Sequence, residues 1–173
     1  RYWNRLHSFP EEGAYRPVRT FTFALDYHFW QLNPRGYHLT NLLLHIGNVL
    51  LVYRLIFLIS GSTRHTDSPI SGVGQSLLPG LPFLTALFFA AHPVHTEAVT
   101  YIKNRGDLLC CLFFLLSFGL FLKMVAQNTR GRQMLYYLGT LAGFLLALFS
   151  KEMALTLPLI LGLYALIFLS GKK

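Results

Sequence analysis

The sequence predicts an all-α fold: a multi-pass bundle of transmembrane helices, preceded by an amphipathic helix on the membrane surface. Hydrophobic residues make up 53% of the 173 residues, and charged residues only 13%. A chain of this size exposes too much surface for so few charges to cover it in water. The apolar residues also gather into long runs, and the polar residues fall between these runs. Both observations place the chain in a lipid bilayer.

Residues 1–36 are predicted to form an external loop that carries the surface helix. The helix should begin at Tyr15-Arg16-Pro17 and end at the turn Asn33-Pro34-Arg35-Gly36. Its apolar residues recur at spacings of three and four, and they include several aromatic side chains, which favours a position along the membrane surface. The apolar stripe consists of Val18, Phe21, Leu25, Phe29 and Leu32, and Arg19, Thr22 and Asp26 lie off it.

Residues 37–173 are predicted to form the transmembrane bundle. A helix needs about 20 apolar residues to cross the hydrocarbon core, with a range of about 17–25. The second of the predicted spans is shorter and contains Pro79 and Pro82, which neighbouring helices can accommodate. The sequence predicts about five spans, at residues 37–60, 77–91, 108–125, 134–150 and 153–170.

Polar residues inside the first predicted span share one helix face. These residues are Asn41, His45 and Asn48. Polar groups in lipid are costly unless they are paired, so this face must meet another helix or a wet cavity. Packing between helices is the favoured interpretation, and the lining of a polar cavity or lipid tunnel is the alternative.

Charged residues predict the orientation. If the spans alternate, one side of the membrane carries most of the cations and is cytoplasmic by the positive-inside rule. The first segment adds further arginines on the other side, which weakens the contrast. The cytoplasmic set is Arg64, Lys123, Arg130, Arg132, Lys172 and Lys173, and the short loops opposite carry Lys103, Arg105 and Lys151.

The net charge of +8 and the cysteine usage exclude two other interpretations. The 15 Lys and Arg residues are scattered at helix ends rather than clustered along one face, so the expected partner is the lipid bilayer and no nucleic acid. Cys110 and Cys111 are adjacent in an apolar run, where they behave as small hydrophobic residues rather than as a disulfide.

The non-cytoplasmic ends of the predicted spans collect polar residues that suit a lipid-linked phosphate substrate. Arginine can bind a phosphate bidentately, lysine acts as a point charge, and a carboxylate or histidine can accept the proton of an incoming hydroxyl. The predicted lipid-phosphate-binding residues are Arg16, Arg19, Lys103, Arg105 and Lys151. The predicted catalytic residues are Glu97, His95 and Asp107, and the predicted substrate pocket adds Tyr15, His38, His92 and Glu152.

Each of these residues also has a structural interpretation. Lys and Arg at span ends often serve as snorkelling anchors. Lys103 and Asp107 can form an ion pair within one helix, and Asp107 can cap the third span. His92 and His95 form a weak metal pair, since Pro93 separates them and only Glu97 or His38 offers a third ligand. No permanently bound cofactor is expected, and a divalent metal is disfavoured.

Several motifs resemble the membrane half of the transmembrane and tetratricopeptide-repeat (TMTC-type) family and its bacterial relatives. They are Tyr15-Arg16-Pro17-Val18-Arg19-Thr20, residues 32–45, Ala91-His92-Pro93-Val94-His95-Thr96-Glu97-Ala98-Val99, Arg105-Gly106-Asp107-Leu108-Leu109 and Ser150-Lys151-Glu152. The resemblance implies a GT-C-type glycosyltransferase fold. It also implies a polyprenyl-phosphate sugar donor, and transfer of a mannose-like sugar to a protein hydroxyl or a glycan on the non-cytoplasmic side.

The resemblance also sets expectations about what lies beyond these residues. Such enzymes place a catalytic acid in the first external loop, which we expect upstream of Arg1 in a longer protein, and Glu97 matches an acidic group of the second external loop. The motifs favour the bacterial inner membrane, with the endoplasmic reticulum as the alternative. A non-catalytic membrane scaffold and a transporter or flippase of lipid-linked substrates are the alternative functions.

Overall fold

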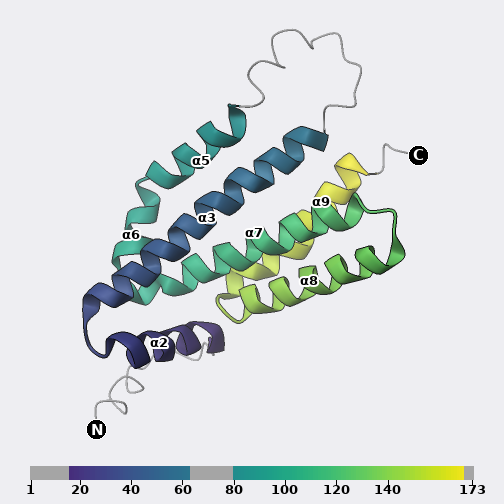
Figure 1. The fold of residues 1–173 in the computed structure, drawn as a ribbon. Helices are drawn as coiled ribbons and strands as arrows, with labels where there is room; N and C mark the ends of the chain where they lie inside the picture. The colour runs from purple at the N-terminus through teal and green to yellow at the C-terminus, as the bar shows by residue number, and fades with distance from the viewer. Residues whose placement is uncertain (1–15, 63–79, 170–173) are drawn as a thin grey trace.

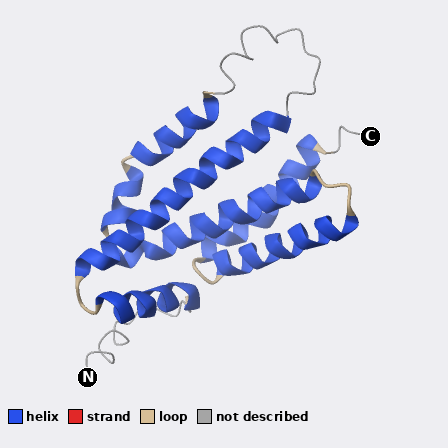
Figure 2. Ribbon diagram, in the orientation of Figure 1, coloured by secondary structure: helices blue, strands red, loops and turns tan. Residues whose placement is uncertain are grey.

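The computed structural model describes residues 16–62 and 80–169, and every regular element in these two ranges is a helix (Figure 2). The all-α prediction is therefore confirmed. In chain order the elements are α2 (Pro17–Trp30), α3 (Pro34–Ser62), α5 (Leu81–Ala91), α6 (Val94–Thr100), the 3-10 helix η2 (Ile102–Asn104), α7 (Arg105–Val125), α8 (Arg130–Leu148), the 3-10 helix η3 (Glu152–Thr156) and α9 (Leu157–Phe168).

The long helices run back and forth between two ends of the molecule (Figure 1). One end, here called the polar end, holds the beginnings of α3 and α7, the whole of α6, and the turn from α8 to η3. The opposite end holds the last turns of α3, α7 and α9 and the first turn of α8. The short helix α2 lies beside the polar end. The connections that precede α7 and α9 therefore share one end of the bundle.

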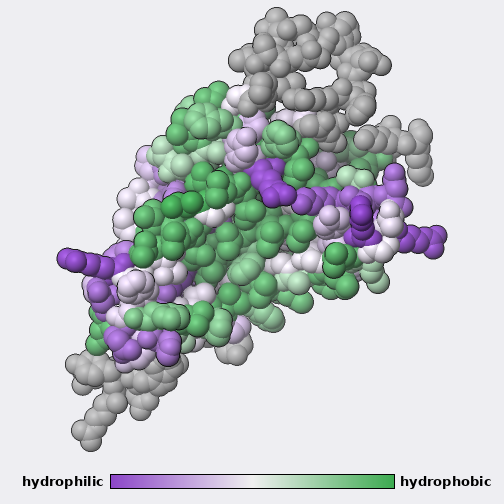
Figure 3. Space-filling model, in the orientation of Figure 1, coloured by the Kyte–Doolittle hydropathy of each residue, from purple (hydrophilic) through white to green (hydrophobic). Residues whose placement is uncertain are grey.

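Among the described residues, two helical segments are long and apolar enough to cross a membrane, Pro34–Ser60 and Ile102–Val125. Two shorter apolar helices accompany them, Leu81–Ala91 and Glu152–Phe168. Large apolar side chains are exposed along the helices, and Phe88 is 74% exposed. Apolar side chains also cover most of the middle of the surface seen in Figure 3. An exposed apolar surface of this kind needs a covering other than water, as a membrane protein has.

One helix begins earlier than predicted because of a proline. Pro34 to Gly36, predicted to be a turn, form the first residues of α3, since proline is favoured at the first helical position. The turn lies before them, at Gln31, whose φ is 52°. The second predicted span ends at the predicted residue, since helix α5 ends at Ala91; His92 is extended because helical dihedrals are disfavoured before proline.

Helix α2 turns its polar side toward the bundle. Asp26 is buried, whereas Phe29 of the apolar stripe is 73% exposed and Phe21 is 63% exposed. A helix docked on a water-soluble core shows the reverse arrangement. The predicted amphipathic helix is therefore present, and its outward apolar side is consistent with the predicted position on the membrane surface.

The polar face inside α3 packs against other helices, which confirms the favoured interpretation. The Asn41 side chain donates to Val99 O (3.3 Å), the Asn48 side chain donates to Leu108 O (3.1 Å), and His45 Nε2 lies 3.4 Å from Ala90 O. Each contact satisfies a polar group on a neighbouring element. These side chains hold α5, α6 and α7 around α3.

Helices α7 and α8 pack closely through small residues. Ser117 Oγ donates to Thr140 O at 2.7 Å. A Cβ on Gly143 would lie 3.1 Å from Ser117 Cβ and 3.4 Å from Phe113 O, so glycine allows a closer approach of the two backbones than a larger residue would. Small residues at such contacts are typical of helix pairs in membranes.

Candidate functional site

The polar end is built around a buried ion pair between α2 and α7. Arg105, the first residue of α7, is 0% exposed, and its Nη2 lies 2.5 Å from Oδ2 of Asp26. The other carboxylate oxygen of Asp26 accepts a hydrogen bond from Thr40 Oγ1 at 2.9 Å. A buried charge is costly unless it is paired, and this geometry pairs both charges.

The remaining donors of Arg105 bind acceptors of the chain itself. Nε donates to Asn41 Oδ1 at 2.8 Å, and Nη2 donates to Tyr37 O at 3.1 Å. The guanidinium also lies 4.5 Å from the ring centre of Phe23, a cation–π contact. The structure thus corrects the prediction that Arg105 binds a lipid phosphate, because its charge is neutralised and enclosed inside the bundle.

A second ion pair is accessible to solvent. Lys151 Nζ pairs with Asp107 Oδ1, and the two side chains are 25% and 37% exposed. Lys151 lies in the turn between α8 and η3, and Asp107 lies in the first turn of α7. Gly106 allows this approach, since a Cβ there would lie 3.3 Å from Ser150 O. Asp107 therefore pairs with Lys151, which lies on a different element. The sequence had suggested Lys103, within the same helix, as its partner.

A third ion pair fastens the start of α2. Arg16 Nη2 donates to both carboxylate oxygens of Glu152, at 3.0 and 3.1 Å. A hydrogen bond from its own backbone, together with the nearby charge of Arg16, holds the pKa of Glu152 below its usual 4.5. The aliphatic part of Arg19 lies against Gly106, where a Cβ would be 3.5 Å from Arg19 Cδ. Arg16, Arg19, Asp107, Lys151 and Glu152 therefore gather at one place, here called the ion-pair cluster.

A histidine cluster lies elsewhere at the polar end. The ring centre of His95 is 5.4 Å from that of His45, 6.0 Å from that of His92 and 4.3 Å from that of Phe89. Burial lowers the pKa of His95 below its ordinary 6.5, and the two neighbouring histidines lower it further. His95 is therefore neutral near pH 7 and can accept a proton.

Glu97 lies on α6 beside the histidine cluster. It is exposed, and its Oε1 accepts a hydrogen bond from Asn104 Nδ2 at 2.9 Å. Lys103 and His38 are exposed on neighbouring elements of the same end. Tyr15 lies outside the described residues. The predicted site residues that the structure describes thus share one end of the molecule. Most belong to the ion-pair cluster or lie near the histidine cluster, whereas Arg105 is buried in its pair with Asp26.

Sequence reasoning missed the residues that organise this end. Asp26 was predicted only to lie off the apolar stripe of the surface helix, and His45 was predicted to pack against another helix or line a polar cavity, with no role at the site. The sequence did carry one signal for both residues. Each is a polar residue in a helix whose neighbouring residues are mostly apolar or aromatic. Within residues 16–62 and 80–169, no group of three or more His, Cys, Asp or Glu side chains could hold a metal ion.

The fold and the polar end define a class: over the described residues, the chain is a helical membrane protein whose acidic side chains gather, with their partners, at one end of its apolar helices. The chain is 36% identical to the human "Protein O-mannosyl-transferase TMTC4" over 99% of its length. It is 38% identical to "Protein O-mannosyl-transferase Tmtc3" of Drosophila melanogaster over 88% of its length, and 32% identical to the human "Protein O-mannosyl-transferase TMTC1" over 92%. The chain belongs to the TMTC family.

The chain spans less than a quarter of the length of these relatives, 23% of TMTC4 and 17% of each of the other two. No family model matches the chain, and no solved structure matches it.

Proposed function

We propose that this chain is the membrane part of a glycosyltransferase that moves a mannose-like sugar from a polyprenyl phosphate to a protein hydroxyl. The observation that carries the proposal is the alignment of a relative named a protein O-mannosyl-transferase over 99% of this chain. The aligned region includes both clusters of the polar end. Lipid-linked donors also require a site at the boundary of the bilayer, where these clusters would lie.

The proposed reaction assigns a role to each cluster. The acceptor hydroxyl oxygen attacks C1 of the sugar, the bond from C1 to the phosphate oxygen breaks, and the polyprenyl phosphate leaves with the electron pair. The hydroxyl proton passes to a base, for which exposed Glu97 and neutral His95 are the candidates. Asp107 holds Lys151 in place to stabilise the growing charge on the phosphate.

Substrate binding is proposed to use the other residues of the polar end. Arg16, Arg19 and Lys103 add positive charge near the phosphate, and exposed His38 and His92 lie where an acceptor would approach. Glu152 positions Arg16 through the ion pair described above. A base in the upstream external loop, expected from the resemblance, would complete the site in the longer protein.

We also propose a five-span topology with the polar end on the non-cytoplasmic side, as in a GT-C-type bundle. The antiparallel helices with shared ends support it (Figure 1). The opposite end carries Lys123, Arg130 and Arg132, in agreement with the positive-inside rule. Because the relatives named above are animal proteins, we favour the endoplasmic reticulum over the bacterial inner membrane that the motifs suggested.

The test is a transfer assay on the full-length protein in detergent, with a radiolabelled mannosyl polyprenyl phosphate and a protein acceptor. We expect label on serine or threonine of the acceptor and a loss of at least about a hundredfold when Glu97→Gln is combined with His95→Phe, as expected for removal of general base catalysis. Cysteine-accessibility mapping tests the topology separately. Opposite compartments for Glu97 and Lys151 would exclude a shared site.

A scaffold is the competing function, and one observation favours it. The ionic partners in the ion-pair cluster and in the Asp26–Arg105 pair all come from the chain itself, which a purely structural network would also show. A scaffold predicts no label transfer by the wild-type protein and no effect of the Glu97 and His95 substitutions on membrane insertion or partner binding.

A further inference from the structure

A groove between α3 and α7 lies far from the polar end. It has a volume of about 150 Å³, and most of its wall is formed by leucines. Nearer the polar end the same two helices are in close contact. Asn48 donates to Leu108 O at 3.1 Å, and a Cβ on Gly47 would lie 3.2 Å from Leu112 Cδ1. The groove therefore begins where this contact ends. Its leucines are Leu51, Leu55 and Leu58 of α3 and Leu115, Leu116 and Leu120 of α7.

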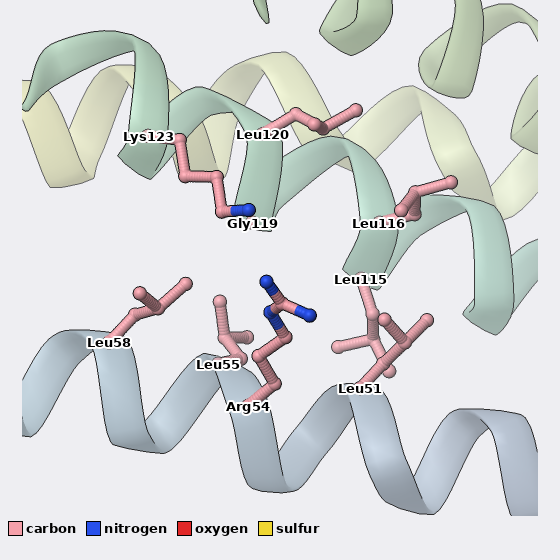
Figure 4. A pocket seen from close by; sticks show the side chains of 9 residues that line it. All are labelled: Leu51, Arg54, Leu55, Leu58, Leu115, Leu116, Gly119, Leu120 and Lys123. Carbon is pink, nitrogen blue, oxygen red and sulfur yellow. The ribbon is translucent and has the colours of Figure 1, made fainter. Parts of the chain in front are cut away.

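Two cations point into this groove from its two walls (Figure 4). Arg54 projects from α3, and Lys123 projects from the last turn of α7, where its ammonium also lies 6.0 Å from the ring centre of Tyr136. Like charges that face one space repel each other unless an anion lies near them. The arrangement calls for an anion between them.

The carboxylates of the described ranges cannot supply this anion. Residues 16–62 and 80–169 contain the acids Asp26, Glu97, Asp107 and Glu152. All four lie at the polar end, where Arg105, Asn104, Lys151 and Arg16 are their partners. The groove thus combines an apolar lining with two cations that no carboxylate of residues 16–62 and 80–169 pairs.

We propose that the groove binds an anionic phospholipid of the leaflet at the opposite end, with its phosphate between Arg54 and Lys123 and an acyl chain along the leucines. Arg54 can bind a phosphate oxygen pair bidentately, and Lys123 adds a point charge. The headgroup of an anionic lipid lies at the depth where long cationic side chains reach the membrane surface. A free phosphate ion would use the cations but not the leucine wall. This site is separate from the proposed transferase site.

The first experiment measures lipid binding by native mass spectrometry of the full-length protein in detergent. Dioleoylphosphatidylglycerol is the anionic probe, and dioleoylphosphatidylcholine is the zwitterionic one. We expect the wild type to prefer the anionic lipid at least about tenfold, and Arg54→Gln/Lys123→Gln to lose that preference. Arg130→Gln/Arg132→Gln is the matched control, because it removes the same charge at the same end of the molecule outside the groove. It should bind like the wild type.

A second pair of variants tests the groove itself. Gly119 lies in its wall, and a Cβ there would meet no atom within 4 Å, so Gly119→Leu can start a side chain there and place its apolar atoms in the groove. Gly162 of α9 has equally open surroundings outside the groove, which makes Gly162→Leu the control for the change in helix propensity. We expect binding of the anionic lipid to fall about tenfold in Gly119→Leu and to stay unchanged in Gly162→Leu.

Three results would overturn the proposal. The first is wild-type lipid binding in Arg54→Gln/Lys123→Gln. The second is an equal loss in the Arg130→Gln/Arg132→Gln control, which would show a general effect of net charge. The third is competition by soluble glycerol phosphate as strong as by the lipid, which would show that the cations bind phosphate without the leucine wall. A thermal melt of each variant separates loss of the site from loss of the fold.

Discussion

Asp26 and Arg105 form an ion pair inside the bundle, at 2.5 Å, although one lies on a short amphipathic helix and the other at the start of a membrane-length helix. Their side chains are 8% and 0% exposed. The pair fixes α2 against α7, and with Asn41 it fixes both against α3. Several of the expected properties of this protein depend on that one contact.

Asp26→Asn should destabilise the protein by about 3–5 kcal/mol, because it leaves the Arg105 guanidinium buried without a counter-charge. The measurement is thermal or chemical unfolding in detergent. The double variant Asp26→Leu/Arg105→Met should recover most of the loss, since it removes both charges together. Arg130→Met, an exposed arginine on α8, is the control and should change little. Independent effects of the two substitutions would contradict a direct pairing.

Variants of the Asp107–Lys151 pair can distinguish a catalytic role of Lys151 from a structural one. Lys151→Gln should lower sugar transfer by at least about a hundredfold through loss of the phosphate-binding charge, with a small effect on stability because the pair is partly exposed. The exchange Asp107→Lys/Lys151→Asp restores an ion pair but not a cation at position 151. We expect it to restore stability and leave transfer low. Recovery of transfer in the exchanged variant would mean that the pair acts only through the fold.

Acid should weaken the histidine cluster. Folding lowers the pKa of His95 below 6.5. As the pH falls below about 6.5, His95 therefore becomes protonated in the unfolded chain before it does so in the folded protein. Stability is therefore full above that pH and is lost as the pH falls toward the lower, folded-state pKa. Melting temperatures at pH 7.5 and 5.5 measure the effect. His95→Phe should reduce the difference between the two temperatures, whereas His38→Gln, an exposed histidine outside the cluster, should preserve it.

Gly143→Ala should destabilise the contact between α7 and α8 by about 1–3 kcal/mol, the usual range for overpacking. The added methyl group would meet Ser117 Cβ at 3.1 Å and backbone at 3.4 Å, so these atoms must move apart by a few tenths of an ångström. Gly119→Ala is the matched control, because its surroundings are open and alanine favours the helix by up to about 1 kcal/mol. Unfolding of both variants tests the contrast, and equal melting temperatures would contradict the close packing.

The helices, and the packing face of α3, could be predicted from the sequence because they depend on local patterns of residues. The apolar runs predicted helices at residues that are helical in the structure, and the spacing of Asn41, His45 and Asn48 predicted the face on which α3 meets its neighbours. Pro17 marked the start of α2. Each of these depends on residues within a few turns of one another, which a single sequence displays directly.

What the sequence could not show depends on distant residues. Lys103 lies one turn from Asp107, and nothing local indicates that Lys151 approaches Asp107 from another helix. Likewise, Arg105 resembled an exposed anchor because its counter-charge belongs to α2. His45 joins His95 only because α5 ends before Pro93 and α6 packs beside α3. These partnerships follow from how the helices assemble.

The inward polar side of α2 sets a practical boundary for shortened versions of the protein. A version that starts after Trp30 would lack Asp26 and would leave the guanidinium of Arg105 without its counter-charge. It would also expose the contact between α3 and α7 that α2 covers. Deleting the first helix to improve handling would thus remove the anion on which the remaining helices depend, and the truncated protein should fail to reach its native assembly.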